Sequence, residues 1–226
     1  MKGCLMFDWT GTLVDEYELD KNVCKNMELE ISRKKGIALE EAKKRYADLL
    51  IRYENNWNWY NYPLHAKIFG IDWKKIQISE LPKLKIIPHA IDVLSNYKKK
   101  GYHIFLLTNA VKAVIDLRID FLEMRSFFDL IVTSVIVKAT KSAGKHFKYA
   151  LKLINVPKKY IYTIGDDLVQ DIFPAKRLEL TAIQCKFGST VYYHTNNYNS
   201  NIKFSAGSPD FVIDNIEELL KIIKDS

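Results

Sequence analysis

The segment Phe7-Asp8-Trp9-Thr10-Gly11-Thr12-Leu13 decides the fold, because in it a strand ends on an acid and a tight turn. The four residues Cys4 to Phe7 are apolar, which predicts a short strand buried on both faces of a parallel sheet. Ligands of open α/β sheets bind outside the carboxyl ends of the strands, and Gly11 lets backbone amides approach one there. Asp8 is therefore either a nucleophile or an aspartate that caps a helix.

The second half of the chain alternates between apolar runs and amphipathic segments. We expect helices near residues 89–100, 112–123, 146–154 and 171–178, and strands near 102–107, 130–133, 160–164, 181–184 and 211–213. A last helix should turn Ile216, Leu219, Leu220 and Ile223 inward. Strands that alternate with helices indicate a parallel sheet with right-handed crossovers. The predicted fold class is α/β, with a Rossmann-like parallel-sheet core and helices on both faces.

Residues 15–84 lack strand-like runs and read as an all-helical insertion. A first helix ending at Gly36 is indicated by apolar residues at four-residue intervals, namely Leu19, Val23, Met27 and Ile31. A second is marked by Ala42, Tyr46, Leu49 or Leu50, and Tyr53, and shorter helical pieces surround 66–69 and 73–76. We therefore divide the chain into a core of residues 1–14 and 85–226 and a helical subdomain of residues 15–84.

Composition narrows the classes of protein that this chain can be. The formal net charge is +7 over 226 residues, but the lysines are scattered, which disfavours a nucleic-acid partner and suits an acidic or phosphorylated ligand. Cys4, Cys24 and Cys185 form neither a metal-like pair nor a disulfide framework, as expected in a reducing cytosol. Without a long apolar run or a signal peptide, we expect a cytoplasmic protein that is not bound to membranes, either a monomer or a homodimer.

Polar residues follow three of the predicted core strands. Asp8, Thr108 and Asp166 each stand at the carboxyl end of an apolar run. Parallel strands end on the same edge of a sheet, so these three side chains should converge there. The convergence favours a functional site at this edge.

Taken together, four motifs in order resemble those of the haloacid dehalogenase superfamily. Phe7–Leu13 resembles the first motif, whose leading aspartate is the nucleophile, and Leu106–Asn109 resembles the second, whose threonine binds a phosphoryl oxygen. Lys141 stands where the lysine of the third motif falls, and Gly165–Asp171 is similar to the acidic fourth motif, which holds magnesium. The helical insertion at 15–84 looks like the cap that closes over the site and selects substrate.

The resemblance implies a magnesium-dependent hydrolase that acts on a small phosphorylated molecule through an aspartyl-phosphate intermediate. Asp8 would be the nucleophile, and Mg²⁺ would be held by Asp8, the Thr10 carbonyl and Asp166. Asp167 would either ligate the ion or orient Lys141. Asp171 would either support the site or cap its helix.

The remaining roles implied by the resemblance concern the phosphoryl group. Lys141 would lie beside it and hold Asp8 ionised, although Lys138 and Lys145 compete for this position. The Thr108 hydroxyl and nearby backbone amides would stabilise the transferring oxygens. We assign binding of the substrate to Thr10, Gly11, Thr12 and Asn109. Asp15 is interpreted as a helix cap.

One position departs from the pattern of the family's phosphatases. They carry a second aspartate two positions after the nucleophile, as acid and base for the leaving group, and here that residue is Thr10. Thr10 therefore argues against an ordinary fast phosphatase and leaves open a slow or specialised phosphatase, a phosphonatase-like enzyme or a non-catalytic binding protein. A 2-haloacid dehalogenase, which would use Asp8 without a metal, is a separate alternative. A phosphonatase would need a Schiff-base lysine, for which Lys43, Lys44 and Lys67 are available. The aromatic cluster at 57–62 is either core of the insertion or a platform for substrate.

Overall fold

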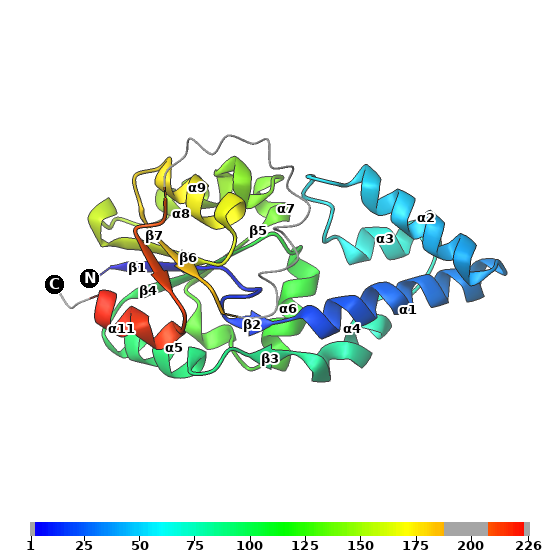
Figure 1. Ribbon diagram of the computed structural model, residues 1–226, viewed down its shortest axis with the longest axis horizontal. Coiled ribbons are helices and arrows are strands. Elements are labelled where there is room, and N and C mark those ends of the chain that lie inside the picture. The colour runs from blue at the N-terminus through cyan, green and yellow to red at the C-terminus, as the bar shows by residue number, and fades with distance from the viewer. Residues whose placement is uncertain (1–2, 188–207, 224–226) are drawn as a thin grey trace.

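Within residues 3–187 and 208–223, which the computed structural model describes, the centre is a six-stranded parallel sheet in the order β5-β4-β1-β6-β7-β8 (Figure 1). The strands are β1 Cys4–Phe7, β4 His103–Thr108, β5 Leu130–Thr133, β6 Ile161–Gly165, β7 Thr181–Cys185 and β8 Phe211–Ile213. In the register, Phe7 lies opposite Leu106 on one side and Ile164 on the other. β1 is therefore central, and β8 is an edge strand, as the sequence predicts.

Helices cover both faces of the sheet, which confirms the predicted fold class. Alternate residues of β1 point to opposite faces, so that Leu5 and Phe7 pack into one core cluster while Cys4 and Met6 pack into the other. The first face is covered by α5 Ala90–Lys99, α6 Lys112–Phe121 and α11 Leu219–Ile222. The second is covered by α7 Ser134–Val137, α8 Lys145–Lys152 and α9 Phe173–Lys176.

The insertion consists of four helices beyond the carboxyl edge of the sheet, and β1 runs toward them (Figure 1). They are α1 Tyr17–Lys35, α2 Leu39–Arg52, α3 Tyr62–Phe69 and α4 Trp73–Glu80. Every apolar residue that predicts α1 is buried, and Gly36 ends the helix with a φ of 62°. The four-residue periodicity thus identified the inward face of α1, and Gly36 identified its end.

A small antiparallel ribbon connects the insertion to the core. Its two strands are β2 Val14–Asp15 and β3 Lys85–Ile86, with Val14 opposite Ile86. The sequence analysis missed this pair, because two-residue strands leave no periodicity to detect. Short 3₁₀ turns complete the described elements: η1 Leu81–Lys83, η2 Arg125–Phe127, η3 Lys141–Ala143, η4 Lys158–Tyr160 and η6 Ile216–Glu218.

Three details differ from the sequence prediction. α2 ends at Arg52, so Tyr53 follows the helix, and the buried residue of the pair 49 and 50 is Leu49. Leu220 is exposed, whereas the other three residues expected to face inward are buried, namely Ile216, Leu219 and Ile223. The helix expected over 171–178 begins earlier, as a π-helical turn, η5 Leu168–Ile172, and α9 ends at Lys176.

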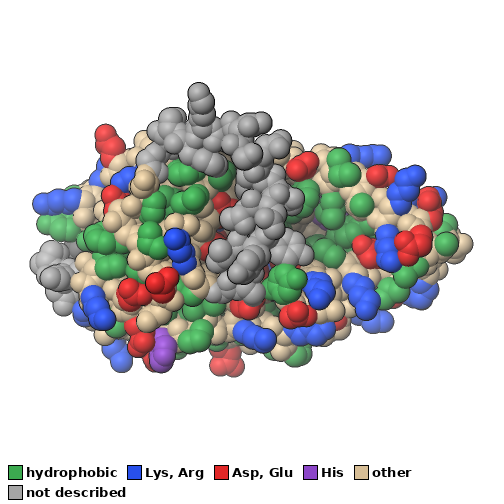
Figure 2. All heavy atoms as spheres, in the orientation of Figure 1, with side chains coloured by type: hydrophobic (Ala, Val, Ile, Leu, Met, Phe, Trp, Pro, Cys, Tyr) green, Lys and Arg blue, Asp and Glu red, His purple; other side chains and the backbone are tan. Residues whose placement is uncertain are grey.

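The described surface has two further features relevant to the predicted partners. On the face shown in Figure 2, Lys and Arg side chains are interspersed with Asp and Glu. No helix in residues 3–187 and 208–223 is both long and apolar enough to cross a membrane. All three cysteines are free, in agreement with their spacing. The Asn-rich segment 195–201, whose role the sequence leaves open, lies outside the described residues.

Candidate active site

The three polar strand ends meet at the carboxyl edge of the sheet, as predicted. Asp8 follows β1, Thr108 ends β4 and Asp166 follows β6, and both other strands pair directly with β1. The Asp8 amide donates a hydrogen bond to the Ile164 carbonyl at 2.8 Å, which extends the ladder onto the acid itself. Asp8 is only 7% exposed. The sheet therefore fixes this carboxylate in a site shielded from water.

Lys141 is the cation of the site. Its Nζ donates to Asp8 Oδ1 and, at 2.5 Å, to Asp171 Oδ1. Burial alone would lower the pKa of this lysine, but Asp171 and Asp8 raise the pKa above its usual value, so the ammonium stays charged. Lys138 and Lys145 are exposed. Of the three candidate lysines, the structure thus brings Lys141 to Asp8.

Three carboxylates crowd around this lysine. A carboxylate oxygen from each of Asp8, Asp166 and Asp171 lies within 4.8 Å of the other two, and we call these residues the acid cluster. Burial, followed by the charges of Asp8 and Asp171, holds the pKa of Asp166 well above its usual range. Burial also raises the pKa of Asp171 to about 8, although Lys141 opposes the shift. Oxygen ligands in a crowded anionic site are what Mg²⁺ prefers, so the cluster fits that ion.

The π-helical turn η5 brings Asp171 back against the end of β6. A Cβ atom on Gly165 would lie 2.3 Å from Asp171 Cγ, so only glycine fits at that strand end. Asp171 Oδ2 accepts the Asp167 amide at 3.2 Å, and Asp171 thus supports both Lys141 and the turn. Asp167 is placed differently, because its Oδ1 accepts the amides of Val169 and Gln170 at 2.7 and 3.1 Å. Its carboxylate caps the turn and is not part of the acid cluster.

Asn109 anchors the segment that carries the lysine. Its Oδ1 accepts the Lys141 amide at 2.8 Å, and its Nδ2 donates to Gln170 Oε1 at 3.1 Å. Gln170 Oε1 also accepts the Ser142 amide at 3.0 Å. Gln170 was missed by the sequence analysis, because a lone glutamine between two acids carries no spacing signal.

Thr108 is held at its strand end by two contacts. Its hydroxyl accepts the Ala110 amide at 3.1 Å, and its carbonyl lies 3.2 Å from His146 Nε2. A carbonyl only accepts, so His146 Nε2 carries the proton. Burial, with the charge of Lys141, lowers the pKa of His146 to about 3, so this histidine is neutral near pH 7. His146 too was missed by the sequence analysis.

The segment after Asp8 forms a tight turn. Gly11 has a φ of 75°, and its amide donates to the Val14 carbonyl at 2.8 Å, so the turn itself uses that amide. Thr12 is fully buried. The Thr10 hydroxyl donates at 2.8 Å to the buried carboxylate of Glu16, a residue that the sequence analysis did not select. Asp15 accepts the Tyr17 amide at 3.0 Å, a local contact just before α1, but the residue at the N-cap position of this helix is Glu16.

The aromatic cluster at 57–62 and the three lysines considered for a phosphonatase Schiff base lie in the insertion. Tyr62 is buried and packs edge-on to His65, whose Nε2 lies 2.9 Å from the Asn58 carbonyl, so this end of the cluster is core. Lys43 pairs with Glu40 at 2.8 Å. The other two alternative lysines, Lys44 and Lys67, are exposed.

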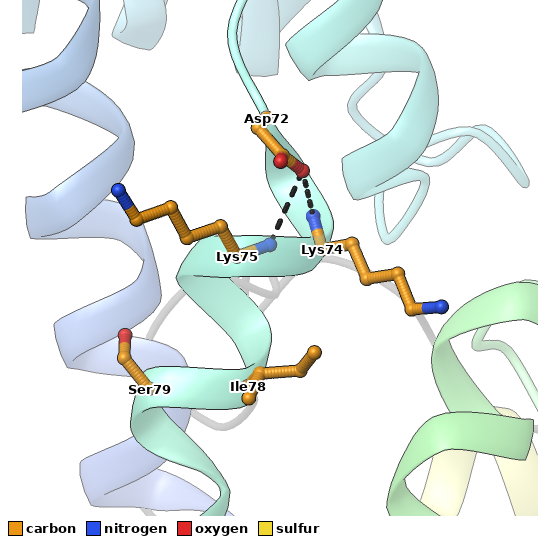
Figure 3. A pocket seen from close by; sticks show the side chains of 5 residues that line it. All are labelled: Asp72, Lys74, Lys75, Ile78 and Ser79. Carbon is orange, nitrogen blue, oxygen red and sulfur yellow. Dashed lines mark hydrogen bonds between the residues drawn. The ribbon is translucent and has the colours of Figure 1, made fainter.

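A surface hollow of about 480 Å³ lies along α4 and is lined by Asp72, Lys74, Lys75, Ile78 and Ser79. Figure 3 shows these five side chains. Asp72 Oδ1 accepts the amides of Lys74 and Lys75 at 3.0 and 3.2 Å, so its carboxylate serves as a helix cap. The two lysine side chains extend in opposite directions (Figure 3). None of the predicted site residues lines this hollow.

A parallel α/β sheet with an acid cluster and a buried lysine at its carboxyl edge defines a hydrolase-like site. A family model described as haloacid dehalogenase-like hydrolase matches residues 3–178, and the chain belongs to this family. The chain is 25% identical to the glyceraldehyde 3-phosphate phosphatase of Pyrococcus furiosus, over 97% of this chain and 92% of that protein.

Solved structures agree with this family. The structure of a HAD phosphatase from Thermococcus onnurineus superposes with a TM-score of 0.81 at 25% identity, covering 100% of this chain and 99% of that one. The structure of a 2-haloacid dehalogenase from Pseudomonas syringae pv. Tomato DC3000 superposes with a TM-score of 0.67 at 17% identity, covering 99% and 98%. Phosphatases and dehalogenases thus share this fold, so the fold alone does not decide between the two activities.

Proposed function

We propose that the chain is a magnesium-dependent phosphatase that hydrolyses a small phosphorylated metabolite through an aspartyl-phosphate formed on Asp8. The observation that carries the proposal is the acid cluster, in which Asp8 contacts Lys141 at the carboxyl edge of the sheet. The curated relatives named glyceraldehyde 3-phosphate phosphatase support a phosphate ester as substrate. We propose that residues 15–84 act as the cap.

The nucleophile is one oxygen of the Asp8 carboxylate. It attacks phosphorus, the bond from phosphorus to the ester oxygen breaks, and the leaving oxygen takes the electron pair and a proton from solvent water. A second water then attacks the same phosphorus and gives up a proton to solvent, and the acyl phosphate bond breaks to release phosphate and restore the carboxylate. Lys141 offsets the negative charge of both anions, and the Thr108 hydroxyl stabilises a transferring oxygen.

The metal would be held by Asp8, Asp166 and the backbone carbonyl of Thr10. When bound, Mg²⁺ neutralises charge on the phosphoryl oxygens and so favours attack by a carboxylate. Asp171 pairs with Lys141, and Asp167 caps the turn η5, so we assign both a supporting role.

Two other functions remain to be separated by experiment. A 2-haloacid dehalogenase would use Asp8 against carbon and has no need of a magnesium site, so the acid cluster counts against it. A non-catalytic binding protein is favoured by Thr10, whose hydroxyl donates to Glu16 and stands where phosphatases of the family carry an acid. We place the protein in the cytoplasm, with a small molecule as its partner.

The test is phosphate release from 4-nitrophenyl phosphate and from glyceraldehyde 3-phosphate, with Mg²⁺ or with EDTA. We expect turnover that needs Mg²⁺ and that Asp8→Asn reduces by more than about 10³-fold. Chloride release from a 2-chloro acid without metal would instead establish a dehalogenase. Equal background from wild type and Asp8→Asn on every substrate would establish a binding protein.

A further inference from the structure

Arg118 lies where the core meets the insertion and is only 2% exposed. From α6 its guanidinium reaches Glu16 Oε2 at 2.9 Å, Asp20 Oδ1 at 2.7 Å and Gln77 Oε1 at 3.1 Å. The Tyr62 hydroxyl donates to Asp20 Oδ1 at 3.1 Å. We call these five residues the junction network.

The network connects three helices of the insertion to one residue of the core. Asp20 comes from α1, Tyr62 from α3 and Gln77 from α4, while Arg118 belongs to a helix that packs on the sheet. Removing one partner from a buried ion pair leaves a charge without compensation, so such pairs hold one geometry strongly. The position of the insertion on α6 is therefore tied to Arg118.

Glu16 of the network also binds the segment that directly follows Asp8, which we call the nucleophile loop. Glu16 Oε1 accepts the indole Nε1 of Trp9 at 2.6 Å, and Glu16 Oε2 accepts the Thr10 hydroxyl at 2.8 Å. Trp9 is fully buried, and its carbonyl accepts the amides of Leu13 and Val14, both at 3.0 Å. One carboxylate thus fixes the side chains of the two residues that directly follow Asp8.

We propose that Glu16 and Arg118 are positioning residues that couple the position of the insertion on the core to the position of the nucleophile loop. Glu16 stands at the start of the insertion and is held by Arg118 of the core. A displaced insertion therefore moves Glu16, and Glu16 moves Trp9 and Thr10, which directly follow the attacking carboxylate. Small errors in the placement of reacting groups have large effects on rate, so the network makes the rate of turnover depend on whether the insertion is docked against α6. The inference rests on the proposed function for its kinetic consequence.

A double-mutant cycle between Glu16 and Thr10 tests this pathway. Glu16→Gln keeps the side-chain length but replaces an accepting oxygen by an NH₂ group, and Thr10→Val removes the hydroxyl at nearly constant shape. We expect each variant to lower kcat by about 10- to 100-fold with KM unchanged. Because both changes break the same contact, the double variant should be no slower than the slower single variant.

The matched control is Arg125→Gln. Arg125 follows α6 and also pairs with two carboxylates, Asp116 at 3.0 Å and Asp120 at 2.5 Å, but its side chain is 45% exposed. We expect wild-type kcat in this variant. If Glu16→Gln leaves kcat unchanged, or if its effect multiplies with that of Thr10→Val, Glu16 only stabilises the fold and the inference is overturned.

Hydrogen exchange gives a readout that needs no turnover. In Glu16→Gln the amides of Leu13 and Val14 should exchange faster, because Trp9 loses a partner, whereas Arg125→Gln should leave them unchanged. If wild type hydrolyses no phosphate ester, the proposed function fails and exchange alone decides the inference. Unchanged exchange at Leu13 and Val14 in Glu16→Gln overturns it.

Discussion

The acid cluster and the junction network are both buried groups of charges, but their balance differs. In the acid cluster three carboxylates share one cation, Lys141, so negative charge is in excess. In the junction network the Arg118 guanidinium contacts two carboxylates, which also accept from Trp9, Thr10 and Tyr62. An excess of like charge suits a site that binds a cation, whereas satisfied hydrogen bonds suit a fixed joint.

Removal of the central cation should give the largest effect on stability and should show most clearly how the two regions differ. Lys141→Met and Arg118→Met should each lower the free energy of unfolding by about 3–5 kcal/mol, because each leaves buried carboxylates without compensation. Relative to wild type at the same Mg²⁺ concentration, urea denaturation should show a smaller loss in Lys141→Met than without the ion and an unchanged loss in Arg118→Met. Lys145→Met, which removes an exposed lysine, is the control. Equal rescue of both variants would contradict the comparison.

A substitution at Gly165 tests the packing that builds the acid cluster. Gly165→Ala places a methyl group 2.3 Å from Asp171 Cγ, so Asp171 must move away from Lys141. We expect a loss of about 3 kcal/mol in stability together with the loss of turnover. In Gly101→Ala the new Cβ meets nothing within 4 Å, and the φ of 81° should cost about 1 kcal/mol. Equal losses would show that Gly165 has no special role.

Removal of magnesium should affect only the acid cluster. At a Mg²⁺ concentration about 100-fold above Kd, Tm should exceed that in EDTA by about 5–10 °C. Asp166→Asn should abolish this increase, whereas Asp20→Asn in the junction network should retain it. Thermal unfolding with and without Mg²⁺ measures both. A Tm increase that survives in Asp166→Asn would place the ion elsewhere.

Near neutral pH the smallest expected effect concerns His146, beside the acid cluster, because its contribution develops only as the pH falls. Its folded pKa is about 3, while the unfolded chain protonates near its ordinary value, so the unfolded state binds more protons below about pH 6.5. Stability should therefore fall as pH drops from about 6.5 to 3, by up to about 1.4 kcal/mol per unit from this group. Denaturation of His146→Gln should show a shallower slope. An equal slope in both proteins would mean that His146 titrates normally.

The two regions also differ in how far the sequence predicted them. Asp8, Thr108, Lys141 and Asp166 follow from strand ends and from motif order, because parallel strands carry such residues to one edge. Glu16 and Arg118 belong to no motif, and the two residues lie far from each other in the chain. Their pairing depends on how the insertion packs against α6, which local patterns do not encode.

The same contrast holds for the elements. Long periodic segments such as Tyr17–Lys35 were predicted well, since many residues report one face. The ribbon of Val14–Asp15 and Lys85–Ile86 and the π-helical turn Leu168–Ile172 were missed, because each depends on partners rather than on its own pattern. The close approach of Gly165 to Asp171 likewise became visible only with the packing.

The ribbon of β2 and β3 has a consequence for how this architecture can vary. With Val14 opposite Ile86 and Asp15 opposite Lys85, the chain departs from the core and returns to it at neighbouring points. Helices can therefore be added, shortened or exchanged between those points without any change in the order or pairing of the strands of the central sheet. Evolution can remodel what lies above the reactive edge while the edge itself keeps its construction.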